Sequence, residues 1–115
     1  MTNKQKFRQL ENDLKWVLID FDDTICNNSG YPKFEPTKPK DGVMAALALI
    51  ESRGWKITVY TARPWRDYQL IEDWMNYYNL PFRRIICGKP IAKWVIDDRN
   101  IEFNGNWKQV IKKMK

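Results

Sequence analysis

Histidine is absent from this 115-residue sequence, and cysteine occurs only twice, at Cys26 and Cys87. Without histidine, the chain can form neither a Ser-His-Asp nor a Cys-His nucleophile system, and it has no histidine general base. Two cysteines alone cannot complete the four-ligand shell of a structural zinc ion, and they make no disulfide framework. The chemistry that remains is that of carboxylates, hydroxyls and amines.

Long apolar segments are missing as well. The longest apolar run, residues 43–50, is far shorter than the roughly 20 residues that span a bilayer. The first 14 residues contain no apolar stretch typical of a signal peptide. Together with the scarcity of cysteine, these absences predict a reduced, cytoplasmic protein without a membrane partner.

The glycine-rich motifs that bind phosphate do not occur either: there is no G-x-x-x-x-G-K-[ST] loop and no G-x-G-x-x-G fingerprint. The net charge is nevertheless +6, which favours anionic partners such as phosphates, nucleotides or nucleic acid. The lysines and arginines are scattered rather than clustered, which is equally typical of a solvated surface. Charge alone therefore leaves both interpretations open.

Helical and strand-like segments alternate along the chain. Apolar side chains recur at helical spacing in residues 3–14, 42–53, 66–78 and 106–114. Short apolar runs predict strands over residues 16–20, 56–60, 84–87 and 94–97. Residues 27–42, which contain three prolines and two glycines, are expected to form a loop. The alternation predicts one α/β domain over residues 1–115, with a parallel sheet between helices.

Within this domain, residues 1–14 form an N-terminal helix, which begins with a T-x-x-Q capping box at Thr2. Residues 15–107 carry the motifs described below, and residues 106–115 form a C-terminal helix. In sheets of this kind, ligands bind beyond the carboxyl ends of the strands. Each of the four expected strands ends at or just before a polar side chain. In chain order these are Asp20 with Asp22 and Asp23, then Thr61, then Lys89, then Asp97 with Asp98.

Several carboxylates gathered at one edge repel one another unless a cation lies among them. Hard oxygen ligands without histidine or cysteine suit Mg²⁺, which in turn attracts phosphate. A hydroxyl and an ammonium opposite the metal would hold the remaining phosphate oxygens. This set of groups fits phosphoryl transfer better than other reactions.

The order of these motifs resembles the haloacid dehalogenase (HAD) superfamily of phosphatases. Its four motifs are matched by "VLIDFDDTI", "ITVYT", "GKP" and "WVIDD", so the resemblance extends over residues 15–107. The segments "YTAR", "CGKPIAKWVIDD" and "FNGNW" further resemble small capless HAD phosphatases described alongside capsule or polysaccharide biosynthesis. The resemblance implies a three-layer, Rossmann-like HAD fold with parallel strand order 3-2-1-4 and no cap domain.

The resemblance also implies roles for individual residues. Asp20 would be the nucleophile that forms an aspartyl-phosphate, and Asp22 would be the general acid and base. Mg²⁺ would bind the Asp20 carboxylate, the main-chain carbonyl of Asp22, and Asp97. Thr61 and Lys89 would hold the transferring phosphoryl group.

Other positions are less sharply defined. Asp98 supports either the metal site or Lys89, Thr24 is expected to contact the substrate, and Arg63 is either a substrate contact or, more in keeping with its position, a structural residue. Only six residues, 88–93, join the third and fourth expected strands, whereas a parallel crossover usually needs about a dozen. Lys93 is therefore an alternative to Lys89 as the motif lysine.

The expected function is Mg²⁺-dependent hydrolysis of a small phosphorylated metabolite, either a sugar phosphate or a nucleotide. The alternatives are a phosphatase that acts on nucleic-acid ends and a non-enzymatic, receiver-like phosphoacceptor domain. A receiver would need its acceptor aspartate after a middle strand, where this sequence has Thr61. In the absence of a cap, the site would be covered by the loop over residues 27–40, by a second subunit in a homo-oligomer, or by the substrate itself.

Overall fold

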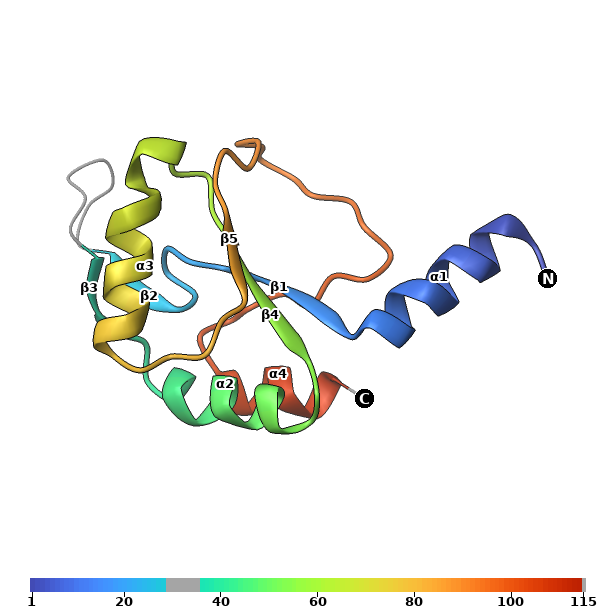
Figure 1. Cartoon of the computed structure of the whole chain (residues 1–115), viewed down its shortest axis with the longest axis horizontal. Coiled ribbons are helices and arrows are strands. Elements are labelled where there is room, and N and C mark those ends of the chain that lie inside the picture. The colour runs from blue at the N-terminus through green and yellow to red at the C-terminus, as the bar shows by residue number, and fades with distance from the viewer. Residues whose placement is uncertain (29–35, 115) are drawn as a thin grey trace.

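Three parallel strands form the central sheet of the computed structural model, which describes residues 1–28 and 36–114 (Figure 1). The strands β1 (Trp16–Asp20), β4 (Lys56–Tyr60) and β5 (Arg84–Ile86) lie in the order β1-β4-β5. Asp20 is opposite Tyr60, and Tyr60 is opposite Ile86, so the three strands end at the same level. The structure thus confirms a parallel α/β sheet, and it places the segments after these strands at one edge.

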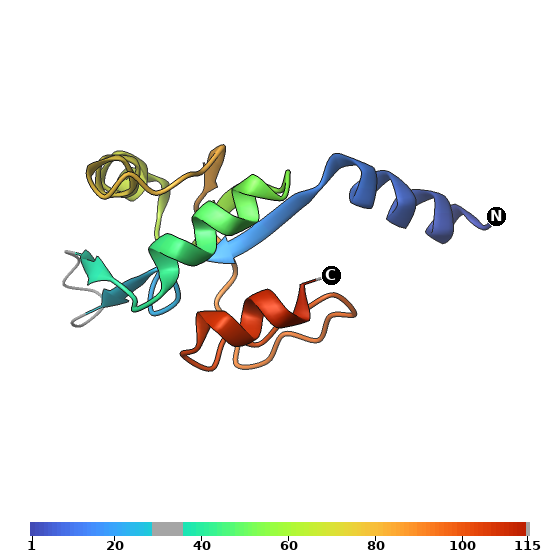
Figure 2. The same ribbon diagram turned by 90° about the horizontal axis from the view of Figure 1, so that it is seen from below.

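Helices account for most of the remaining regular structure. They are α1 (Asn3–Leu14), α2 (Val43–Ser52), the short 3-10 helix η1 (Trp65–Asp67), α3 (Tyr68–Tyr77) and α4 (Trp107–Lys113). Helix α2 packs against α4 and β4, while α3 packs against β5 (Figures 1 and 2). Among the described residues, no helix is both long and apolar enough to cross a membrane. All four expected helices are present, with small shifts at their ends.

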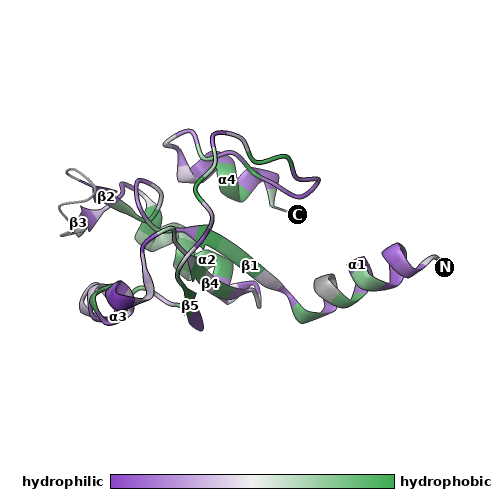
Figure 3. Ribbon diagram, turned by 90° about the horizontal axis from the view of Figure 1, so that it is seen from above, coloured by the Kyte–Doolittle hydropathy of each residue, from purple (hydrophilic) through white to green (hydrophobic). Residues whose placement is uncertain are grey.

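The core lies between the sheet and these helices. On α2, the buried side chains are Val43, Ala46, Leu47 and Ile50, whose three- and four-residue spacing places them on one face. Strand β4 is buried from Ile57 to Val59 because it lies between two other strands. Figure 3 shows apolar residues gathered on the central strands and α2. Each large apolar side chain buried here contributes about 1.5–3 kcal/mol to stability.

Helix α1 projects away from the rest of the chain (Figures 1 and 2). Its capping box forms as expected: the Gln5 N–H donates to Thr2 Oγ1 at 3.1 Å, and the Thr2 N–H donates to Gln5 Oε1 at 2.7 Å. The apolar face of the helix, made by Phe7, Leu10 and Leu14, is exposed. Local capping therefore defines where α1 begins, while tertiary packing contributes little to it.

The expected fourth strand over residues 94–97 is absent, because residues 87–106 contain no helix or strand. All residues from 90 to 100 are exposed, and Ile96 is 99% accessible. The six-residue link over 88–93 is shorter than the dozen or so residues of an ordinary parallel crossover, and in this structure the segment after it pairs with no strand. Strand β1 is consequently one of the two edges of the sheet, and its Leu18 is 56% exposed.

The segment expected to be a loop, residues 27–42, contains regular structure. Strand β2 (Cys26–Asn28) pairs antiparallel with β3 (Pro36–Pro39), with Cys26 opposite Pro39 and Asn28 opposite Pro36. The prolines of β3 are compatible with pairing because proline is tolerated at the edge of a sheet. The prediction of a loop is therefore wrong for these two strands.

Candidate active site

The turn after β1 is organised around one main-chain carbonyl. The oxygen of Phe21 accepts N–H groups from Thr24 at 3.4 Å, Ile25 at 2.9 Å and Cys26 at 3.1 Å. Phe21 and Ile25 are fully buried and anchor the turn in the core. Asp23 has a φ of 57°, in the left-handed region that aspartate tolerates better than most residues. The turn thus fixes the acidic residues relative to the end of β1.

Asp20 and Lys89 face each other at the carboxyl edge of the sheet. Lys89 Nζ lies 3.9 Å from Asp20 Oδ1, and both side chains keep partial access to solvent. Burial raises the pKa of the Asp20 carboxyl above its ordinary value. The ammonium of Lys89 opposes this shift, whereas the charges of Asp22 and Asp23 add to it. A carboxylate that is partly buried, accessible and adjacent to a cation is suited to attack an electrophile.

Main-chain hydrogen bonds position Lys89. The Thr61 N–H donates to the carbonyl of Ile86 at 3.0 Å, and the Lys89 N–H donates to the carbonyl of Thr61 at 2.9 Å. Pairing between the β4 and β5 segments therefore continues past the ends of both strands. The alternative residue, Lys93, lies over the ring of Trp94 at 5.8 Å, in the exposed segment. The structure thus brings Lys89, and not Lys93, to Asp20.

Asp22 is held by Arg63, which follows β4. Arg63 Nε donates to Asp22 Oδ2 at 2.9 Å, and Nη2 donates to Oδ1 at 2.8 Å. The Asn28 amide also donates to Oδ1, at 3.1 Å. Burial alone would lower the pKa of the Arg63 guanidinium, but the hydrogen bonds and the charge of Asp22 outweigh burial and raise it. Asp22 is therefore fixed by three donors from two segments.

Arg63 itself is fully buried, which favours the structural role over a contact with the substrate. Its second acidic neighbour is Asp67, whose Oδ2 lies 3.7 Å from Nη1. The guanidinium carbon lies 5.7 Å from the centre of the Phe21 ring. In this structure Arg63 contacts Asp22 rather than the solvent from which a substrate would enter.

The two threonines singled out from the sequence have local contacts. Thr61 is fully buried, and its Oγ1 accepts the N–H of Arg63 at 3.0 Å. Thr24 is half-buried, and its carbonyl accepts the indole N–H of Trp107 at 3.1 Å. Thr61 thus shapes the turn that carries Arg63, while Thr24 links the β1 turn to α4. Their contacts with a phosphate stay a prediction.

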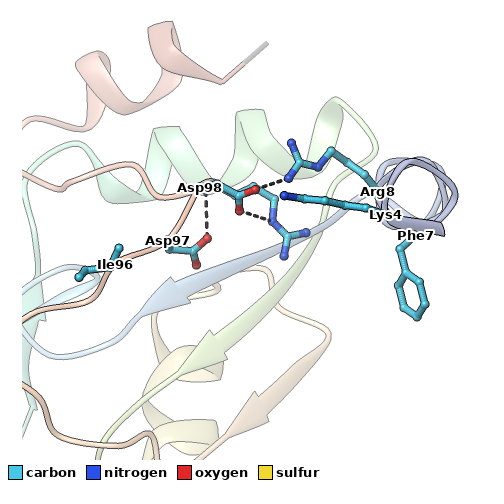
Figure 4. Close-up of a pocket in the computed structure, with 7 residues that line it drawn as sticks. Lys4, Phe7, Arg8, Ile96, Asp97 and Asp98 are labelled. Carbon is cyan, nitrogen blue, oxygen red and sulfur yellow. Dashed lines mark hydrogen bonds and ion pairs between the residues drawn. The ribbon is translucent and has the colours of Figure 1, made fainter. Parts of the chain in front are cut away.

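Asp97 and Asp98 lie near α1, with the carboxylate of Asp98 directed toward Arg8 (Figure 4). They line a cavity of about 460 Å³ together with residues of α1, and none of the residues that line it belongs to the site around Asp20. Asp98 pairs with Arg8 of α1, whose hydrogen bond lowers the pKa of the Asp98 carboxyl. Among residues 1–28 and 36–114, no three acidic or cysteine side chains are grouped closely enough to hold a metal ion. The expected set of Mg²⁺ ligands is therefore not assembled in this structure.

Two residues that contribute to the site, Asn28 and Asp67, were not predicted from the sequence. Asn28, on β2, donates to the carboxylate of Asp22, and its main-chain N–H donates to Asp23 Oδ1 at 3.2 Å. Asp67, at the end of η1, flanks the guanidinium of Arg63. No local pattern points to Asn28, because its role depends on a strand pair that the proline-rich sequence does not predict.

Neither a protein-family model nor a curated protein matches the sequence. Among solved structures, the chain is similar to the crystal structure of an MCSG target from Vibrio cholerae, with a TM-score of 0.63 and 23% sequence identity. The similarity covers 88% of this chain and 99% of the Vibrio cholerae chain. At this level of identity, the two proteins share a fold.

Proposed function

We propose that this chain is an HAD-type, Mg²⁺-dependent phosphomonoester hydrolase that acts through an aspartyl-phosphate on Asp20. One observation carries the proposal: the accessible carboxylate of Asp20 lies 3.9 Å from the ammonium of Lys89, at the carboxyl ends of parallel strands. An Asp nucleophile beside a cation that attracts phosphate is the arrangement that phosphoryl transfer needs.

Each side chain has a defined task in this reaction. An oxygen of Asp20 bonds to phosphorus as the bond from phosphorus to the leaving oxygen breaks. The leaving oxygen takes a proton from Asp22. Water then attacks the aspartyl-phosphate and gives a proton to Asp22, so that inorganic phosphate leaves and Asp20 is regenerated. Lys89 offsets the negative charge of the transferring group throughout.

The oxygen donors at this edge fit Mg²⁺ chemically. The Asp20 carboxylate and the main-chain carbonyl of Asp22 would hold the ion, and Mg²⁺ usually keeps several water ligands. When bound, the ion would neutralise phosphate charge and polarise the phosphoryl oxygens. We also propose Asp97 as a ligand and Asp98 as a supporting residue, which requires them to leave their positions beside α1.

A complete HAD fold would supply that rearrangement. Adding residues 94–97 to the open edge of β1 gives strand order 3-2-1-4 and carries Asp97 to the carboxyl end of the sheet. The exposed Leu18 on β1 and the exposed apolar residues Trp94, Val95 and Ile96 support this step, because pairing would bury them. The three-layer arrangement without a cap is part of the same proposal.

A small phosphorylated metabolite in the cytoplasm is the proposed substrate. The site would be covered by the segment over residues 27–40, by a second subunit or by the substrate. The side chains of this segment that are suited to hold a phosphorylated substrate include Tyr31, Lys33 and Phe34, which lie outside the described residues. The middle strand β4 ends before Thr61 rather than an aspartate, which counts against a receiver-like domain.

Turnover of a panel of sugar phosphates, nucleotides and 3′-phosphorylated oligonucleotides, with Mg²⁺ or with EDTA, tests the proposal. We expect Mg²⁺-dependent phosphate release that is abolished in Asp20→Asn, because an amide does not attack phosphorus. Asp23→Asn is the matched control: it removes an exposed carboxylate from the same turn and should retain most of the activity. Beryllium fluoride should bind the wild type and not Asp20→Asn. Full activity of Asp20→Asn would refute the proposed nucleophile.

The net charge of +6 keeps a nucleic-acid-end phosphatase as the second candidate. The dependence of affinity on salt separates the two candidates, because each phosphate contact on a single strand steepens the log–log slope by about 0.7. We expect a shallow slope for the best small substrate. Much tighter binding of the oligonucleotide, with a slope that indicates several phosphates, would replace the metabolite by a nucleic-acid end.

A further inference from the structure

Burying the charged guanidinium of Arg63 costs free energy, which its two acidic partners must offset. Arginine is rarely buried completely unless it is paired, since removing its charge from water is unfavourable. Arg63 has no exposed surface, whereas the neighbouring Arg66 side chain is 80% accessible. The partners of Arg63 are the two carboxylates described above, Asp22 by two hydrogen bonds and Asp67 by an ion pair. The chain thus places a cation beneath the proposed general acid and base.

The contact with Asp22 fixes an orientation as well as a charge. Two donors of one planar guanidinium reach the two oxygens of one carboxylate, so rotation of that carboxylate would break at least one hydrogen bond. A lysine could match the charge of Arg63 but not this paired geometry. The Asn28 amide adds a third donor from the opposite segment.

Arg63 is itself locked in place. Its N–H donates to Thr61 Oγ1 at 3.0 Å, and its carbonyl accepts the N–H of Gly88 at 2.9 Å. Gly88 immediately precedes Lys89, so the same turn fixes both the carboxylate of Asp22 and the main chain beside the ammonium that faces Asp20. The main chain of Arg63 is therefore held at both its N–H and its carbonyl, and the buried side chain extends from it to Asp22.

From this geometry we infer that Arg63 is a positioning residue for proton transfer by Asp22, an inference that rests on the proposed function and deepens it. As the bond from phosphorus to the leaving oxygen breaks, that oxygen takes the proton, and Asp22 is left as the carboxylate that Arg63 holds. The two hydrogen bonds thus aim the proton donor and stabilise the charge that develops on it. Arg63 acts through Asp22 and does not contact the substrate.

The leaving group provides a selective test. An aryl phosphate such as p-nitrophenyl phosphate has a leaving oxygen that needs little protonation, whereas an alkyl phosphate such as glycerol phosphate depends on the acid. Since general acid catalysis contributes about 10²–10⁴-fold, kcat/KM of Arg63→Gln, which reports the transfer of the phosphoryl group to Asp20, should fall at least about 10-fold further on the alkyl than on the aryl substrate. Arg63→Lys should show the same selectivity. Arg66→Gln, the exposed neighbour, should match the wild type on both substrates.

A second variant guards against misfolding, because Arg63 is buried. Asp67→Asn keeps Arg63 and removes the charge of its second acidic partner, together with a 4.0 Å ion pair to the exposed Arg66, and the Asp67 side chain makes no capping hydrogen bond to α3. We expect a smaller loss with the same preference for the aryl substrate, and Asp67→Asn decides the test if the Arg63 variants do not fold. An equal loss on both substrates, or none, in the folded variants would overturn the inference alone. Failure of the wild type to hydrolyse any phosphomonoester would overturn the proposed function and this inference with it.

Discussion

Replacing Lys89 by alanine removes the cation that faces Asp20, and the structure gives the scale of the effect. Two unit charges 3.9 Å apart attract by about 4 kcal/mol at an effective dielectric constant of 20. Both side chains are partly exposed, at 29% for Lys89 and 42% for Asp20, so the pair contributes at most about 1 kcal/mol to folding. Stability should therefore change little in Lys89→Ala.

Catalysis should suffer far more, because the same ammonium lies where the charge of a phosphoryl group would develop. Losing such a contact typically costs about 2–4 kcal/mol of transition-state stabilisation. This range corresponds to a fall of about 30- to 1000-fold in kcat/KM. The assay is release of p-nitrophenol from p-nitrophenyl phosphate at saturating Mg²⁺, with circular dichroism to verify folding.

Lys93→Ala is the matched control for this experiment. Lys93 lies four residues further along, over the ring of Trp94. We expect Lys93→Ala to retain nearly full activity. Near-normal turnover in Lys89→Ala together with an inactive Lys93→Ala would refute the assignment and place the motif lysine four residues later in the chain.

Three further expectations concern stability and reactivity. The raised pKa of Asp20 means that its negative charge destabilises the folded state. This destabilisation is absent below the ordinary pKa of 3.8, where the carboxyl is protonated in both the folded and the unfolded state, and it develops as the pH rises. In EDTA, Asp20→Asn should therefore have a higher Tm than the wild type at neutral pH and an equal Tm in strong acid. Burial raises the pKa of Cys26 to about 12 and also raises that of Cys87, so neither native thiol should react with iodoacetamide at pH 8, whereas rapid labelling would contradict their burial. Trp107→Phe removes the hydrogen bond to the carbonyl of Thr24 and should cost about 1 kcal/mol in urea unfolding.

The sequence predicted much of the fold because local periodicity determines it. The buried face of α2, with Leu47 and Ile50 at its centre, and the buried strand β4 follow from apolar spacing alone. The strand expected over residues 94–97 is not formed in this structure, since an apolar run reports burial propensity but not whether the run pairs with another strand. Strands β2 and β3 were missed for the converse reason: their pairing is tertiary, and prolines conceal it.

In the candidate site, too, the positions of some residues could be predicted from the sequence and those of others could not. Asp20 and Lys89 were expected together because parallel strands end at one edge, and the structure places them there. The burial of Arg63 could not be predicted, since arginine is usually exposed and its partner Asp22 is 41 positions away in sequence. Asp97 was expected at the site only through the strand that precedes it, so the absence of that strand also removes Asp97 from the cluster.

The pairing that continues past the ends of β4 and β5 has a consequence for how this site could change over evolutionary time. The hydrogen bonds from Thr61, Gly88 and Lys89 use only main-chain atoms, so they place Lys89 whatever side chain it carries, while the φ of 79° at Gly88 favours glycine there. A substitution at Lys89 therefore changes the side chain that a ligand meets, while the main chain at residue 89 stays in place. Such a frame allows new specificities to be tried one residue at a time while the fold is inherited unchanged.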